Sequence, residues 1–137
     1  MKLADVLDSA IELPVAPSFT KVGYQLRSRL DHWRPLDSYD LTSRTMVVTG
    51  ATSGLGRAAA LKFAALGANV VIVGRDRSKT DRVRDEIASA TGSARLETGI
   101  ADMSDLDQVG ARAIGLAGGG RKIGALSHNA GALSARR

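Results

Sequence analysis

The sequence of 137 residues contains no cysteine, two histidines and only 4% aromatic residues. Without cysteine there can be no disulfide bond, thiolate metal site or cysteine nucleophile, and two histidines leave little material for a metal site. No apolar run reaches the roughly eighteen residues of a transmembrane helix, and no signal-peptide-like hydrophobic segment follows Lys2. We therefore expect a cytoplasmic protein.

The net charge of +5 does not by itself indicate a nucleic-acid partner. The arginines are spread along the chain, and no set of zinc ligands or aromatic–basic platform for stacked bases accompanies them. We therefore interpret the charge as solvated surface and expect no nucleic acid to bind.

The chain divides near Asp40 into residues 1–40, a helical N-terminal extension, and residues 41–137, which form one domain. The first part contains all three prolines and the only tryptophan. Apolar side chains in it recur at helical spacing, and the helix they predict begins at the cap Ser18 and ends near Pro35. The residues of this stripe are Phe19, Val22, Leu26, Leu30 and Trp33.

Basic residues cover the other faces of this helix, so the segment Ser18 to Arg34 has three interpretations. Its apolar stripe packs onto the following domain, or it forms a partner or dimer surface, or it lies on a membrane surface with its arginines reaching the headgroups.

From Arg44 onward, strand and helix patterns alternate. Short apolar runs predict strands at 45–49, 69–73 and 123–127, and a weaker pattern predicts one at 94–98. Helical patterns fill the gaps at 54–66, 79–90 and after Ser104. Such alternation implies right-handed crossovers and a parallel sheet. We predict an α/β fold, a Rossmann-type sheet of about four strands with helices on both faces.

The sequence also predicts which residues cap these helices and which face inward. Ser78 and Ser104 are the expected N-caps of the second and third helices. The expected buried faces are Leu55, Ala59, Phe63 and Leu66 on the first helix, Val83, Ile87 and Ala90 on the second, and Leu106, Val109, Ala113, Ile114 and Ala117 on the third.

A glycine-rich turn, Thr49-Gly50-Ala51-Thr52-Ser53-Gly54-Leu55-Gly56, joins the first strand to the first helix. Glycines permit a tight turn and a close backbone approach, and the free N–H groups of the helix start attract an anion. Strand, turn and helix follow in that order, so the segment predicts a site for a phosphate-bearing cofactor. Without a ligand, the glycines would serve packing alone, with Thr52 and Ser53 as caps.

The spacing Thr49-Gly50-x-x-x-Gly54-x-Gly56 resembles the cofactor motif of the short-chain dehydrogenase/reductase family. Two further segments agree with that family: Asn129-Ala130-Gly131 after the fourth strand, preceded by His128 where the family has another asparagine, and Asp102 after the third strand. The resemblance covers residues 40–131. It implies hydride transfer between NADP(H) or NAD(H) and a carbonyl or alcohol.

The resemblance also implies roles for the matching residues. Asp102 would meet the adenine, Asn129 would brace neighbouring strands, and Gly131 would let the backbone pass close to the cofactor ribose. The predicted cofactor-binding residues are Gly50, Thr52, Ser53, Gly54, Leu55, Gly56, Gly74, Arg75, Asp76, Asp102, Met103, Asn129, Ala130 and Gly131.

Two residues after the second strand bear on the choice of cofactor. An arginine near this strand end accommodates a 2′-phosphate, whereas an acidic residue holds the free 2′-hydroxyl. Arg75 therefore favours NADP(H), while Asp76 keeps NAD(H) as the alternative.

The catalytic tyrosine, lysine and serine of the family have no match in this sequence. Both tyrosines, Tyr24 and Tyr39, precede the glycine-rich turn, and Ser28 and Ser43 stand where a lysine would follow four residues later. The chain ends at Arg137, ahead of where the family places these groups. We expect a fragment that binds cofactor but has no turnover alone.

Three hypotheses remain open at this point: the N-terminal half of a truncated or split oxidoreductase, a non-catalytic NADP(H)-binding or regulatory module, and an interaction protein acting through residues 1–40. The expected partners are the cofactor and either a second copy or a missing C-terminal half. A fourth strand with an unpaired edge predicts marginal stability or association through that edge.

Overall fold

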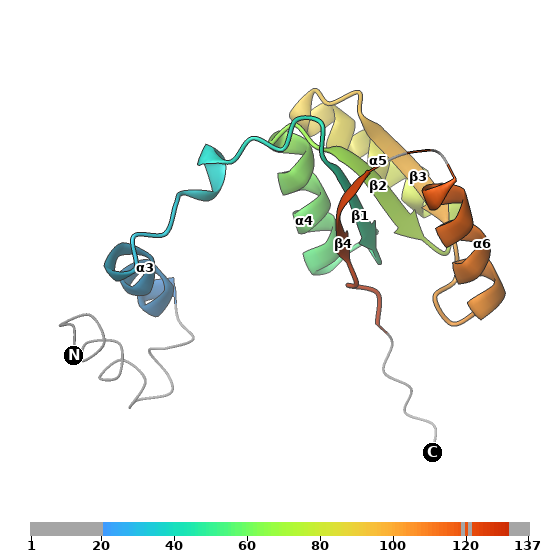
Figure 1. The fold of residues 1–137 in the computed structure, drawn as a ribbon, viewed down its shortest axis with the longest axis horizontal. Coiled ribbons are helices and arrows are strands. Elements are labelled where there is room, and N and C mark those ends of the chain that lie inside the picture. The colour runs from blue at the N-terminus through green and yellow to red at the C-terminus, as the bar shows by residue number, and fades with distance from the viewer. Residues whose placement is uncertain (1–20, 119, 121, 132–137) are drawn as a thin grey trace, which may run out of the picture. The chain divides into compact units, whose positions relative to one another are not determined.

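The computed structural model describes residues 21–118, 120 and 122–131. The chain divides between Tyr39 and Asp40 into two compact units (Figure 1). The first contains α3 (Lys21–Leu30) and the 3-10 turn η1 (Leu36–Ser38). The elements of the second unit, in order, are β1 (Thr45–Thr49), α4 (Gly54–Ala65), β2 (Asn69–Gly74), α5 (Arg77–Thr91), β3 (Leu96–Ile100), α6 (Leu106–Ala117) and β4 (Ile123–Ser127).

The helix of the first unit ends earlier than its apolar stripe predicts. It stops at Leu30, and His32 then takes a left-handed φ of 54°, which turns the chain before Trp33. The ring of Trp33 meets Tyr24 edge-on, with 5.8 Å between centroids. Trp33 therefore packs against the helix without belonging to it. Ser18 and Phe19 lie outside the described residues, and none of the described helices is long and apolar enough to cross a membrane.

The four strands form one sheet in the order β3-β2-β1-β4, with every neighbouring pair parallel (Figure 1). The two central strands are valine-rich and almost entirely buried, as parallel strands covered on both faces must be. The predicted fold class is confirmed. The third strand is shifted two residues from the predicted 94–98.

One face of the sheet is closed by α4 and α5. Its core joins side chains of the two central strands to Ala60, Ala64, Val83 and Ile87 of the helices, and Ile72 at its centre is completely buried. Burying a side chain of that size contributes about 2 kcal/mol. This core is the rigid base from which the loops at the strand ends project.

The buried stripe of α4 differs from the predicted one. Gly56, Ala60 and Ala64 are buried, whereas Leu55 is 82% exposed. The smallest residues of the helix face the sheet because they allow its backbone to approach closely. A pattern that counts large apolar residues therefore selects a neighbouring stripe.

Both predicted serine caps were wrong, because an aspartate caps each helix instead. The carboxylate of Asp76 accepts a hydrogen bond from the Lys79 backbone N–H at 3.0 Å and begins α5 at Arg77. Asp105 accepts from the N–H groups of Asp107 and Gln108 and begins α6. Charged caps satisfy free N–H groups and interact with the helix dipole. At the far end of α5, Ala90 is exposed rather than buried.

The opposite face of the sheet is covered less completely. Val47, Val71, Val73 and Ala101 form a small core there, against which Leu116 of α6 packs. No residue of α6 is buried, and Leu106 and Ile114, predicted as core, are 83% and 74% exposed.

The edge strand β4 is also largely exposed on this face. Leu126 pairs with the buried Val47 and so faces the same side, yet is 49% exposed, and Ile123 is 43% exposed. An apolar strip thus lies beside an edge strand without a second neighbour.

We predict that replacing Leu126 by serine reduces self-association of the chain, because it removes apolar surface beside the free strand edge. The measurement is sedimentation velocity over a range of protein concentrations. Leu61→Ser, at a residue 39% exposed on the covered side of the sheet, is the control and leaves association unchanged. Equal association of the two variants would contradict the prediction.

We also predict that acid unfolding depends on the aspartate caps. Hydrogen bonds from Lys79 N–H and Ser78 hydroxyl lower the pKa of Asp76, and Gln108 lowers that of Asp105. A lowered folded pKa contributes stability above the unfolded pKa of about 3.9, and this contribution is lost as pH falls toward the folded value.

Urea midpoints should therefore be level from about pH 7 to 5 and fall below about pH 4. Asp76→Asn still caps the helix but does not titrate, so its midpoint should fall less steeply with acid. Identical acid dependence in both proteins would overturn this assignment.

Candidate cofactor-binding site

Four loops meet at the carboxyl ends of the four parallel strands and enclose a pocket of about 750 Å³. This is the position at which open α/β sheets bind their ligands, and the volume suits a cofactor-sized molecule. The residues that line it are Gly50, Thr52, Ser53, Gly54, Leu55, Val73, Gly74, Arg75, Ala101, Asp102, Met103, Ser104, Asn129, Ala130 and Gly131.

The glycines of the first loop allow backbones to touch where a side chain would not fit. Gly50 has φ 66°, and a Cβ there would lie 2.8 Å from the Cα of Ala130. A Cβ on Gly56 would lie 2.5 Å from the Gly50 carbonyl oxygen and collide with the side-chain amide of Asn129. The start of α4 and the loop after β4 therefore close on each other through glycine.

Hydrogen bonds hold these two loops together. The Thr49 hydroxyl donates to the Ser127 carbonyl at 3.3 Å and accepts from the N–H groups of Asn129 and Ala130, each at 3.2 Å. The Asn129 amide donates to the Gly50 carbonyl at 3.2 Å. Asn129 thus joins the loops of two adjacent strands and lies at the pocket rim.

The N-terminus of α4 opens onto this pocket without a side-chain cap. Ser53 occupies the N-cap position in extended conformation, yet its hydroxyl makes no capping hydrogen bond. The first N–H groups of a helix need an acceptor, and their partial positive charge favours an anion. In α5 and α6 a carboxylate fills that role, whereas no side chain does so at α4.

The loop after β2 places Arg75 at the pocket and uses Asp76 elsewhere. Arg75 is exposed and lines the pocket. Asp76 is not among the lining residues, and one of its carboxylate oxygens accepts both from Lys79 N–H and, at 2.8 Å, from the Ser78 hydroxyl. The acidic side chain at this strand end therefore caps a helix and does not line the pocket.

The loop after β3 presents Asp102. One oxygen of its carboxylate accepts from the N–H of Ser104 at 2.9 Å and from the Ser104 hydroxyl at 2.7 Å. These two bonds, helped by the charge of Arg75, lower the pKa of Asp102. The side chain is therefore a fixed anion at neutral pH that can accept hydrogen bonds but not donate them.

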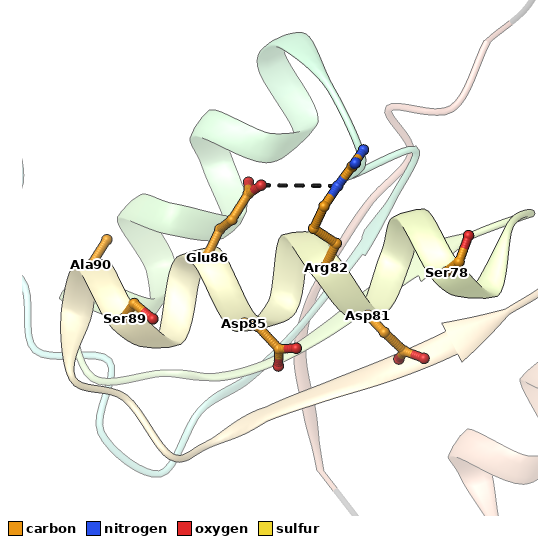
Figure 2. A pocket seen from close by; sticks show the side chains of 7 residues that line it. All are labelled: Ser78, Asp81, Arg82, Asp85, Glu86, Ser89 and Ala90. Atoms are coloured by element: carbon orange, nitrogen blue, oxygen red, sulfur yellow. Dashed lines mark ion pairs between the residues drawn. The ribbon is translucent and has the colours of Figure 1, made fainter.

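Another hollow lies along α5, and Figure 2 shows its seven side chains. All come from one helix, and its charged groups pair with neighbours: Arg82 with Glu86 at 4.0 Å, and Arg84 with Asp81 at 3.5 Å. All its lining residues thus belong to one helix, and its charged groups already have partners. Across the described part of the chain, no cluster of three metal-ligating side chains occurs.

The structure brings most of the predicted site residues to one pocket. Gly56 and Asp76 do not line it: Gly56 lies in close contact with Gly50 and Asn129, and Asp76 caps α5. Sequence reasoning missed Val73, Ala101 and Ser104, which flank the predicted residues in the same loops. It also missed the hydrogen bonds that Thr49 makes to the loop after β4. A threonine at the end of a strand is common, and nothing in the sequence indicates which partner its hydroxyl takes.

Comparison with known proteins adds family evidence to this geometry. Residues 44–137 match the family model described as short chain dehydrogenase. A short chain dehydrogenase of Aspergillus nomiae is 34% identical over 114 residues, which cover 78% of this chain and 31% of that protein.

Two solved structures are similar to this chain in sequence and fold. A metagenomic short-chain oxidoreductase in complex with NADP is 41% identical, with a TM-score of 0.61 over 67% of this chain and 41% of that one. A protein of Escherichia coli CFT073 complexed with NADPH is 30% identical, with a TM-score of 0.63 over 73% of this chain and 41% of that one.

The chain spans about a third of the Aspergillus relative and two fifths of these solved structures. The family model nonetheless matches well over half of the chain. By its sequence, its sheet order and the loops at its strand ends, this chain belongs to the short-chain dehydrogenase family.

Proposed function

We propose that this chain forms the NADP(H)-binding part of an oxidoreductase that transfers hydride between the cofactor and a carbonyl or alcohol. The observation that carries the proposal is the uncapped N-terminus of α4, which opens onto a pocket whose glycine backbones leave room for a ligand. Relatives of similar fold solved with NADP and NADPH support it.

The residues present fit a dinucleotide in distinct ways. The N–H groups at the start of α4, with Thr52 and Ser53, would hold the pyrophosphate, since this is where an anion is favoured. Asp102 would accept a hydrogen bond from the adenine amino group, and the backbone of Asn129 to Gly131 would pass along the nicotinamide ribose. The bound cofactor supplies the hydride, whereas the protein binds and orients it.

The end of β2 favours the phosphorylated cofactor. Arg75 is exposed at the pocket with its guanidinium available to a 2′-phosphate, for which Arg is the preferred partner. Asp76, the residue that would favour NAD(H), caps α5 and does not line the pocket. We therefore assign NADP(H) as the cofactor.

Carbonyl reduction also needs an acid over the nicotinamide, and the chain offers no tyrosine after Tyr39. Tyr24 and Tyr39 both belong to the first unit. We propose that the catalytic groups come from residues outside this sequence, either in a longer protein or in a second chain. A non-catalytic NADP(H)-binding module is the alternative that the same observation allows.

The direct test titrates the full 137-residue chain with NADPH and NADH by calorimetry and then assays carbonyl reduction. The proposal expects NADPH to bind more tightly than NADH and expects no turnover. Turnover would overturn the assignment of catalysis to other residues, and absence of NADPH binding would overturn the proposed function.

We predict that Arg75→Ala weakens NADPH binding about tenfold or more and leaves NADH binding nearly unchanged, because a charge-assisted hydrogen bond contributes about 1.5–3 kcal/mol. Raising the salt concentration should reduce the difference between the two proteins. Arg82→Ala, which removes a 70% exposed arginine of α5 outside the pocket, is the matched control. A parallel loss for both cofactors would argue against a contact to the 2′-phosphate.

We predict that Gly56→Ala abolishes measurable NADPH binding and lowers the urea midpoint, because the added Cβ pushes α4 away from Gly50 and Asn129. Gly110→Ala is the matched control, since a Cβ at this helical glycine meets nothing within 4 Å. It should raise stability by up to about 1 kcal/mol through helix propensity and keep binding intact. Normal NADPH affinity in Gly56→Ala would disprove the close-contact role.

A further inference from the structure

Gln108, in the first turns of α6, connects the pocket to the start of that helix. Its side-chain oxygen accepts a hydrogen bond from the Asp102 backbone N–H at 3.1 Å, and its side-chain nitrogen donates to Asp105 at 2.7 Å. The partners determine this amide orientation, because an N–H requires the oxygen and a carboxylate requires the nitrogen. Gln108 itself is exposed and is not among the residues that line the pocket.

Few contacts hold the start of α6 and the segment that precedes it. No residue of α6 is buried, and in the preceding segment Ala101 is buried and Met103 packs against the small core. The backbone bonds there are from Ala101 N–H to the Gly74 carbonyl at 3.0 Å and from Asp105 N–H to the Asp102 carbonyl at 3.1 Å. The Gln108 side chain thus adds a hydrogen bond that ties the Asp102 backbone N–H to α6. The cap by Asp105 fixes Gln108 in turn, because its carboxylate accepts from both the backbone and the side chain of Gln108.

The carboxylate of Asp102 is held from a second direction. One oxygen accepts both hydrogen bonds from Ser104, which leaves the other oxygen to a ligand. Ser104 fixes the side chain and Gln108 fixes the main chain that carries it. A carboxylate held at both points is oriented before the ligand arrives, which lowers the entropy cost of binding.

We propose that Gln108 is a positioning residue that sets the direction in which Asp102 faces the adenine amino group. This inference rests on the proposed function, because it requires an adenine nucleotide in the pocket. Gln108 acts through Asp102 and makes no contact with the ligand itself. Its loss therefore changes recognition of the adenine amino group rather than binding of the dinucleotide as a whole.

The experiment compares NADPH with its deamino analogue, in which an oxo group replaces the adenine amino group. Dissociation constants of both are measured by calorimetry for the full chain and for Gln108→Ala. Wild type should prefer NADPH about tenfold, the effect expected of a hydrogen bond to a charged acceptor. In Gln108→Ala this preference should fall to about twofold or less, with affinity for the deamino analogue nearly unchanged.

Asp107→Ala is the matched control, because it truncates the adjacent side chain, whose carboxylate makes no hydrogen bond within the described part of the chain. It should retain the wild-type preference. Alanine favours the helix, so a loss in Gln108→Ala cannot come from weaker helix propensity, and circular dichroism verifies the fold of both variants.

The possible outcomes separate the positioning role of Gln108 from the proposed function. An unchanged preference in Gln108→Ala, or an equal loss of affinity for both nucleotides, would overturn the positioning role. A wild type that binds the two nucleotides equally would overturn it as well, since Asp102 would not then read the amino group. A wild type that binds neither nucleotide would instead refute the proposed function.

Discussion

The close contact between the glycine turn and the loop after β4 is the constraint on which the site depends. Gly50 approaches Ala130, and Gly56 approaches both Gly50 and Asn129, at distances that no Cβ permits. This contact joins the loops after β1 and β4 into one wall of the pocket. It also directs the N-terminus of α4 toward that pocket. Replacing either glycine would separate groups that lie far apart in sequence but form a single surface.

The two faces of the sheet support the pocket loops to different degrees. On one side, α4 and α5 pack on a dense core of valine, isoleucine and alanine, so the loops that leave β1 and β2 have a rigid base. On the other side, α6 rests on a small core through half-buried residues and is attached at its start by polar contacts. The end of the pocket at the start of α4 therefore depends on packing, whereas its Asp102 end depends more on hydrogen bonds.

Sequence patterns predicted the sheet well because its signals are strong. The β-branched runs of β1 and β2 can satisfy their backbone and side chains only as buried strands, and the alternation of strands with helices around them requires parallel crossovers. The glycine turn and Asn129 were also visible, since their residue types are tied to local backbone geometry. These signals are short-range and therefore survive in a single sequence.

The errors came from properties that depend on three-dimensional context. The buried stripe of α4 consists of Gly56, Ala60 and Ala64, since close helix–sheet approach selected small residues over Leu55. Asp76 and Asp105 could not be separated from Ser78 and Ser104 as caps, because both residue types suit that role. The exposure of Ile114 reflects how little of α6 touches the sheet, which periodicity does not report.

The single hydroxyl of Thr49 has a consequence for the order in which the molecule assembles. It bonds to Ser127, Asn129 and Ala130, and so ties down a strand whose own residues are mostly exposed. With so little buried surface, β4 should open before the other strands in local unfolding and dock last in folding. The wall of the pocket is then completed only when β4 docks. A ligand that binds only the completed pocket would therefore shift the equilibrium between undocked and docked β4 toward the docked state.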